Sequence, residues 1–236
     1  MLELHQFQSN FGLPNPSPFC MKTEAYLRLA GIEYETKLVT DPSKGPNGKA
    51  PWIIDDGKTL PDSRFIIEHL NRKHGYPLKG ELSQEELASH HTLGRMLDES
   101  TYWAVVYERW IVPENAPTIR DAFFGSLPGP MRKLIFVVAQ RGVKRALFGQ
   151  GTGRLSRDDI NHLAKTDIDA LAHILGDQDY FGGEKAAEID ATTMSFIASL
   201  VKSPVSSESS DYIKTKDNLV AYHQRMMTQL FPEYAT

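Results

Sequence analysis

A serine and a cysteine near the N-terminus have the residue types and the spacing for chemistry at a negative sulfur or oxygen. They occupy positions 17 and 20 in the run NPSPFC, residues 15–20. Serine is favoured just before a helix and proline at its first position, so Ser17 and Pro18 predict a helix that begins here. The hydroxyl and the thiol then share the first turn, where free N–H groups and the helix dipole favour an anion. The alternative is a capped helix with a buried Cys20.

The segments around this helix predict the sheet that would position it. Residues 2–6 and 34–39 alternate between apolar and polar side chains, which predicts two strands. A strand, a helix and a strand in this order form a βαβ unit with parallel strands. Two short apolar runs around Asp56-Gly57 then predict a hairpin, and a helix follows Asp62. The order βαβ-ββα is that of a thioredoxin-like domain.

The composition changes after Gly75, and the rest of the chain is helical in pattern. Ser83 opens a capping box, and apolar residues recur at helical spacing from 84 to about 110. Further helices are predicted from 131 to 148 and from about 211 to 230. The sequence therefore predicts an α/β thioredoxin-like domain at residues 1–78 and an all-α domain at residues 83–236.

Three short motifs resemble the glutathione S-transferase family. Ser17-Pro18-Phe19-Cys20 is similar to the first active-site turn of these proteins and has the spacing of the glutaredoxin Cys-Pro-Phe/Tyr-Cys motif, with serine in the first position. Gly48-Lys49-Ala50-Pro51 is similar to the segment that contains the family's cis-proline, and Pro61-Asp62-Ser63 looks like its Glu/Asp-Ser pair. The resemblance covers nearly the whole chain, and it is nearest to the branch named for failed axon connections and metaxin.

The resemblance implies a glutathione transferase that joins the glutathione thiolate to a hydrophobic electrophile. Ser17 would be the catalytic residue, donating a hydrogen bond to the thiolate. The backbone of Ala50, after a cis bond to Pro51, would pair with the cysteinyl amide of glutathione. Asp62 and Ser63 would bind the γ-glutamyl group, with plain helix capping as the alternative. Lys49 or Lys44 would bind the glycine carboxylate, with a solvated loop charge as the alternative. The full set of residues expected to bind glutathione, the co-substrate, is Phe19, Lys49, Ala50, Pro51, Asp62 and Ser63.

Aromatic residues at the end of the helix from 84 to about 110 are candidates for the electrophile pocket. The resemblance places this helix opposite Ser17, so Tyr102, Trp103 and Tyr107 are the expected pocket residues. The alternative is that they pack in the core between the two domains.

Two other functions fit the same residues. A glutathione-dependent thiol reductase would use Cys20 as the nucleophile, because a cysteine on the first turn of a helix can have a lowered pKa. A non-catalytic adaptor would keep the fold and lose the chemistry, since a fold does not fix a function.

Composition limits the remaining possibilities. The chain has 236 residues, 41% of them hydrophobic, one cysteine and a net charge of −4. These values predict a cytoplasmic globular protein without a nucleic-acid-binding surface, a membrane span or a signal peptide. The histidines show no spacing typical of metal ligands. The resemblance also implies a homodimer.

The residue expected to cap the family's central helix departs from the family's pattern. The Ser/Thr-x-x-Asp motif that begins the family's central helix has its aspartate at Asp190, but Ala187 occupies the cap. Losing such a cap costs about 1 kcal/mol, so either another group caps this helix or the chain belongs to a divergent branch of the family.

Overall fold

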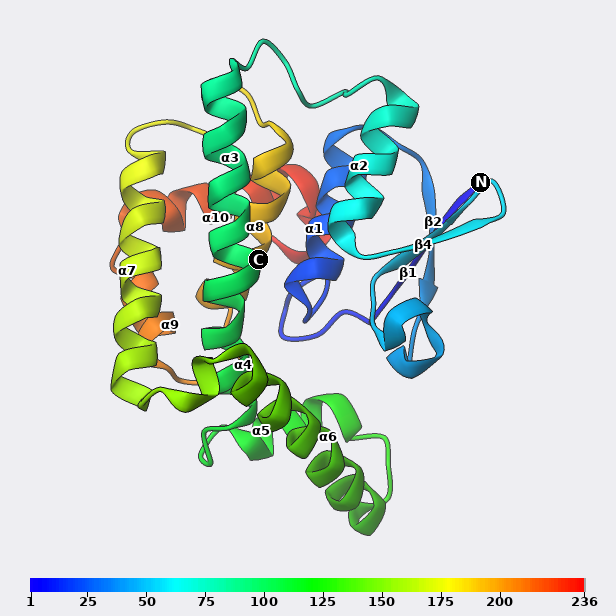
Figure 1. Ribbon diagram of the computed structural model, residues 1–236, viewed down its shortest axis with the longest axis vertical. Helices are drawn as coiled ribbons and strands as arrows, with labels where there is room; N and C mark the ends of the chain where they lie inside the picture. The colour runs from blue at the N-terminus through cyan, green and yellow to red at the C-terminus, as the bar shows by residue number, and fades with distance from the viewer. Residues whose placement is uncertain (236) are drawn as a thin grey trace.

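The computed structural model describes residues 1–235. The N-terminal part of the chain forms a four-stranded mixed sheet (Figure 1). The strand order is β2-β1-β3-β4, with β1 parallel to β2 and antiparallel to β3. Inward-facing Leu2, Leu4 and Gln6 are buried on β1 as the alternation predicted. The strands are β1 (Leu2–Gln6), β2 (Tyr34–Leu38), β3 (Trp52–Asp55) and β4 (Lys58–Pro61).

The β3–β4 hairpin turns at the dipeptide that the sequence indicated. Asp56 and Gly57 have φ values of 49° and 76°, and a two-residue turn of this kind needs positive φ at both positions. The turn fixes the register, in which Trp52 lies opposite Pro61.

Two helices cover one face of the sheet in Figure 1. They are α1 (Pro18–Leu29) and α2 (Ser63–His74). Both start where the sequence predicted, because Ser17 and Asp62 cap them through their side-chain oxygens. The thioredoxin-like domain is thereby confirmed.

The remainder of the chain is helical, as expected, and differs from the prediction in detail. The helix expected from 84 to 110 is interrupted by a π-helical turn at Leu97–Thr101. The single helix expected from about 211 to 230 is instead two helices, because Ser207 caps a short helix and Lys216 has extended backbone. The helices are α3 (Gln84–Met96), α4 (Tyr102–Trp110), α5 (Ala116–Phe124), α6 (Gly129–Gln150), α7 (Arg157–Leu175), α8 (Glu188–Val201), α9 (Glu208–Ile213) and α10 (Asp217–Leu230).

The two halves share one hydrophobic core, in which α1 packs against α8. Met21, Ala25 and Tyr26 of α1 and Phe196 and Ile197 of α8 are fully buried in it. Since α1 carries Ser17 at its start, the helical half directly supports the predicted site.

Asp190 resolves the question of the missing cap. Its two carboxylate oxygens accept hydrogen bonds from the backbone N–H groups of Phe181, Gly182 and Ala187, at 2.8, 2.9 and 2.9 Å. The Tyr222 hydroxyl donates a fourth bond at 2.9 Å. The aspartate therefore organises the start of α8 without a serine or threonine at position 187.

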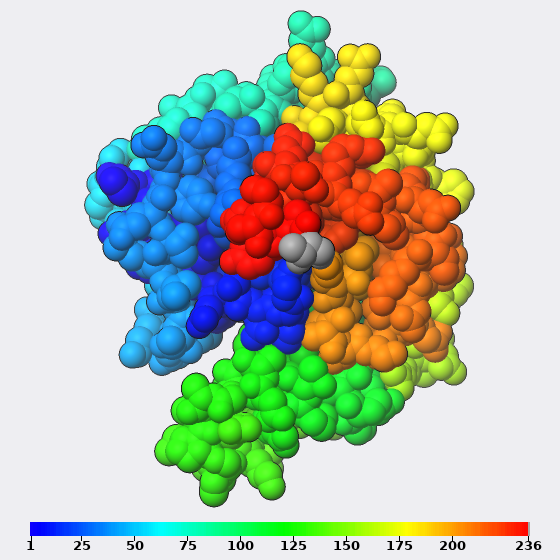
Figure 2. Space-filling view, turned by 180° about the vertical axis from the view of Figure 1, so that it is seen from behind, coloured from blue at the N-terminus to red at the C-terminus, as the bar shows by residue number. Residues whose placement is uncertain are grey.

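Helix α6 projects from the rest of the molecule, and residues of α5 and α6 form the green lobe of Figure 2. The exposed side of α6 carries apolar residues at helical spacing, namely Met131, Leu134, Ile135 and Val138.

Among residues 1–235, no helix has both the length and the hydropathy to span a membrane.

Candidate functional site

The register of the sheet brings the three sequence motifs to one edge. Trp52 lies opposite both His5 of β1 and Pro61 of β4. Pro51 is therefore next to the end of β1, which leads into the Ser17 loop, and next to the β4–α2 turn at Asp62. Segments 17–20, 48–51 and 61–63 consequently meet at the same end of the strands.

Ser17 lies at the start of α1 in the geometry of a helix cap. Its Oγ accepts a hydrogen bond from the Cys20 N–H at 3.5 Å, and the residue is half-buried. Ser17 is the N-cap of α1, so the helix dipole would favour an anion placed here.

Asn15 holds the Ser17 turn, and the sequence reasoning missed this role. Its side-chain oxygen accepts from the Ser17 N–H at 3.1 Å, while its amide donates to the Phe7 carbonyl at 2.8 Å. Asn15 is fully buried. An asparagine that bonds the backbone two residues ahead is a common turn former, so the Asn-Pro-Ser sequence itself carried a usable signal.

The Ala50–Pro51 peptide bond is cis, as expected. Pro51 is buried, Ala50 is half-buried, and Lys49 and Lys44 are exposed. The close packing of Gly45 on the Trp52 ring, where a Cβ would lie 2.5 Å from the ring, fixes the loop that carries both lysines.

Asp62 and Ser63 lie at the start of α2. Asp62 has a φ of +70°, in the left-handed region that residues other than glycine rarely adopt, and its carboxylate accepts from the Arg64 N–H at 3.0 Å. Ser63 is buried. Strained backbone of this kind often accompanies function.

Cys20 is poorly suited to act as a nucleophile. The residue is fully buried, and burial raises the pKa of its thiol to about 12, although hydrogen bonds from the Ser17 side chain and the Phe7 backbone lower it. The reactive species is the thiolate, which requires a lowered pKa and access. These observations argue against the reductase interpretation.

We expect Cys20 to resist alkylation in the folded protein. Because its pKa is raised, the thiolate fraction should stay small up to about pH 11, and burial should exclude the reagent. Iodoacetamide labelling followed by mass spectrometry should therefore be slow between pH 7 and 9 without denaturant and fast in denaturant. Rapid labelling of the native protein at pH 7 would contradict this assignment.

The three predicted pocket aromatics are divided between two environments. The Tyr102 ring contacts the Phe19 ring at 4.7 Å between centroids, and Trp103 packs on Tyr102 at 5.2 Å. Tyr107 instead packs with Ala104, Ile160 and Ala164, on the side of α7. Only Tyr102 and Trp103 are thus linked to the Ser17 turn by these contacts.

A second aromatic group joins the loop before Ser17 to α5. The Phe11 ring lies 6.1 Å from the Phe123 ring, and Trp110 packs on Phe123 at 5.7 Å. Asn10 also donates to the Ala122 carbonyl at 3.2 Å. The loop before Ser17 is therefore attached to α5, which only tertiary structure could reveal.

The comparisons with known proteins agree with this geometry. A model of the glutathione S-transferase N-terminal domain matches residues 18–115, and a model of the C-terminal domain matches residues 164–226. The isoprene-epoxide–glutathione S-transferase of Rhodococcus sp. (strain AD45) is 32% identical, with 97% of this chain and 99% of that protein covered. Failed axon connections of Drosophila melanogaster is 26% identical, with 99% of this chain and 59% of that protein covered.

Solved structures show the same fold at low identity. The β-etherase LigF of Sphingobium sp. strain SYK-6 has a TM-score of 0.69 and 19% identity, covering 98% of this chain and 99% of that one. FzlA from C. crescentus has a TM-score of 0.64 and 13% identity, covering 99% and 91%. The full-length match to the Rhodococcus enzyme and the two domain models show that the chain belongs to the glutathione S-transferase family.

Proposed function

We propose that the protein conjugates glutathione to a small hydrophobic electrophile, with Ser17 as the residue that favours the thiolate. The observation that supports this most is the convergence of Ser17, the cis Ala50–Pro51 segment and Asp62-Ser63 at one sheet edge. An extended tripeptide with a carboxylate at each end can pair its backbone with an open strand edge. The relative from Rhodococcus makes epoxides the first electrophiles to test.

The reaction follows from the groups at this edge. The glutathione thiol loses its proton to solvent, and the Ser17 hydroxyl donates a hydrogen bond to the sulfur anion. A hydroxyl hydrogen can rotate, so the Ser17 O–H can turn toward the incoming sulfur. The sulfur lone pair forms a bond to an epoxide carbon, the C–O bond breaks, and the oxygen takes up a proton from water. Tyr102, Trp103 and the Phe11–Phe123 pair supply apolar surface for the electrophile.

Two measurements test the proposal. Binding of glutathione to the purified chain by calorimetry comes first, followed by turnover with isoprene epoxide and with a generic aryl halide. Saturable binding with conjugate formation supports the transferase. Binding without any turnover favours a different thiol reaction, and no binding at all favours the adaptor.

Asp62 should contribute to glutathione affinity more than to the rate of transfer. A carboxylate that bonds the γ-glutamyl ammonium contributes about 1.5–3 kcal/mol, so Asp62→Asn should weaken glutathione binding by about tenfold or more. Asparagine tolerates positive φ and can still cap α2, so this variant removes the charge and keeps the turn. Calorimetry and the KM for glutathione measure the effect. Equal loss in kcat, with unchanged KM, would be the contrary result.

We also propose a cytoplasmic homodimer. The exposed apolar residues of α6 and Phe65 on α2, which is 61% exposed, are surfaces that a second copy could cover. Two-fold dimers are the commonest oligomers. Light scattering at micromolar concentration should give about twice the chain mass of 26.5 kDa, and Leu134→Glu with Val138→Glu should lower it if α6 is the interface. A monomer mass for the parent would refute the dimer.

A further inference from the structure

Arg109 on α4 is a buried cation that forms no ion pair with a carboxylate within residues 1–235. It is 6% exposed, and its Nε has no hydrogen-bond partner there. A buried charge is costly unless a counter-charge and hydrogen bonds compensate it. A neutral side chain would fill this volume at a lower cost, so the charge requires a functional explanation.

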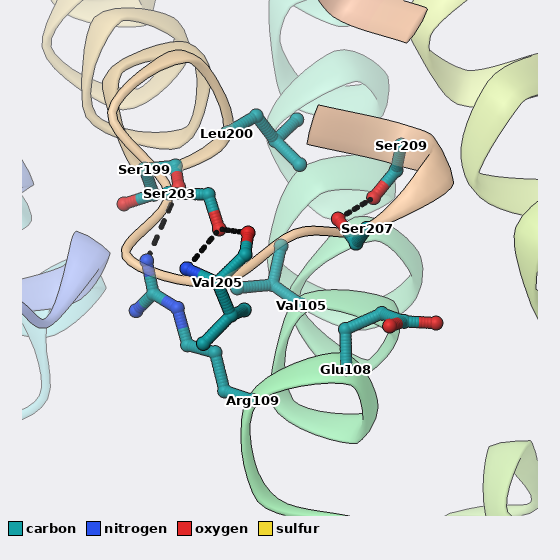
Figure 3. A pocket seen from close by; sticks show the side chains of 9 residues that line it. All are labelled: Val105, Glu108, Arg109, Ser199, Leu200, Ser203, Val205, Ser207 and Ser209. Atoms are coloured by element: carbon teal, nitrogen blue, oxygen red, sulfur yellow. Dashed lines mark hydrogen bonds between the residues drawn. The ribbon is translucent and has the colours of Figure 1, made fainter. Parts of the chain in front are cut away.

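The guanidinium of Arg109 joins the Ser17 turn to the central helix. Its Nη1 donates to the Pro16 carbonyl at 2.9 Å. Its Nη2 donates to the Ser199 carbonyl at 3.1 Å (Figure 3). Pro16 directly precedes Ser17. Since Asn15 holds the same turn from the side of β1, the turn is fixed between two buried polar side chains.

The small cavity beside Arg109 has no room for an anion in contact with the guanidinium. Figure 3 shows the guanidinium at the edge of a small cavity between α4 and the segment after α8. The cavity has a volume of about 10 Å³ and is lined in part by Val105, Ser203 and Val205. This volume is near the minimum for one water molecule, so it cannot admit a carboxylate from another molecule.

The ionisable groups near Arg109 leave its charge uncompensated. Burial raises the pKa of Tyr102 and of Cys20, so both are neutral at pH 7. Glu108 lines the same cavity, but its carboxylate pairs with Arg157 of α7 at 3.2 Å. From the N-terminal loop, the Phe11 ring lies 5.8 Å from the Arg109 guanidinium and offers a cation–π contact but no counter-charge. Burial lowers the pKa of Arg109 to about 10, which still leaves the guanidinium charged at pH 7.

We propose that Arg109 is a positioning residue that fixes the Ser17 turn through the Pro16 carbonyl and provides the positive charge that favours the glutathione thiolate. The inference rests on the proposed function, because it needs the thiolate at Ser17. A charge acts over a longer distance in protein than in water, so the guanidinium influences the sulfur without touching it. When the sulfur becomes negative, it supplies the counter-charge that Arg109 otherwise lacks.

Three variants separate charge from geometry. Arg109→Lys keeps the charge, Arg109→Gln keeps a donor without charge, and Arg109→Met keeps only the volume. The pH dependence of kcat and the ultraviolet thiolate absorbance of the glutathione complex both report the pKa of the bound thiol. That pKa should rise by about one unit in the Gln and Met variants and stay near the parent value in the Lys variant. The matched control is Arg120→Gln, an arginine of α5 that pairs with Asp121 and should leave the profile unchanged.

The outcomes are distinguishable. An unchanged thiol pKa in the Gln and Met variants would overturn the inference, and so would a folded Lys variant with the same shift as the Gln variant. If the Gln variant does not fold, the Met and Lys variants decide, because replacing a buried charge by an apolar side chain is often tolerated. A parent that fails to bind glutathione overturns the proposed function as well. A parent that binds it with a lowered thiol pKa, insensitive to residue 109, overturns the role of Arg109 alone.

Discussion

Replacing Ser17 with alanine is expected to slow glutathione transfer by roughly ten- to a hundredfold and to leave glutathione affinity nearly unchanged. A hydrogen bond to a charged partner contributes about 1.5–3 kcal/mol, and each 1.36 kcal/mol corresponds to about tenfold in rate. Binding should persist because Ala50, Asp62 and Ser63 hold the peptide. The pKa of the bound thiol should rise, since its anion loses a donor. The measurements are kcat, KM for glutathione and the pH profile of kcat.

The control must separate chemistry from helix capping, because Ser17 also caps α1. Ser83→Ala is matched, since Ser83 is a serine cap at the start of α3, and it should cost a similar stability of about 1 kcal/mol without lowering kcat. Cys20→Ser should be nearly silent, because its hydroxyl can keep the bonds to Ser17 and to the Phe7 backbone. Loss of activity in Cys20→Ser together with a tolerated Ser17→Ala would instead identify a thiol reductase.

Replacing Asp190 with alanine is expected to cost about 3–5 kcal/mol of folding free energy. The change leaves three backbone N–H groups without their acceptor in a buried region and removes one of the partners of the Tyr222 hydroxyl. The start of α8 should loosen, and α8 is the helix on which α1 packs. Urea unfolding at pH 7 measures the free energy of unfolding, and the melting temperature should fall on the order of 10 °C.

Two further variants accompany Asp190→Ala: Asp190→Asn tests the hydrogen bonds, and Asp179→Asn is the exposed control. Both carboxylate oxygens of Asp190 accept from backbone N–H groups, so an asparagine in either orientation would turn its amide towards at least one N–H donor and should also destabilise the fold. Asp179 is an exposed aspartate that pairs with Arg225, and its replacement should change stability by less than about 1 kcal/mol. A stable Asp190→Ala protein would show that another group begins α8.

Local features of the sequence determined where the thioredoxin-like elements begin and how they are joined. Ser17 and Asp62 cap their helices through bonds to residues two or three positions ahead, and such contacts depend only on neighbours in the chain. The Asp56-Gly57 turn sets the β3–β4 register in the same way. Since this register places Pro51 beside Asp62, the positions of the predicted glutathione-binding residues followed largely from sequence.

Long-range packing decided the chemistry that each of these positions can perform. The pKa of Cys20 is high because the core closes over it, although the first turn of a helix alone favours a thiolate. Tyr107 lies one turn from Trp103, yet the approach of α7 packs it, half-buried, against a different cluster. Arg109 reaches the Pro16 carbonyl across 93 positions of sequence, and Asn10 reaches Ala122 across 112. Burial and contacts between distant segments depend on how whole helices pack, and no local pattern encodes that packing.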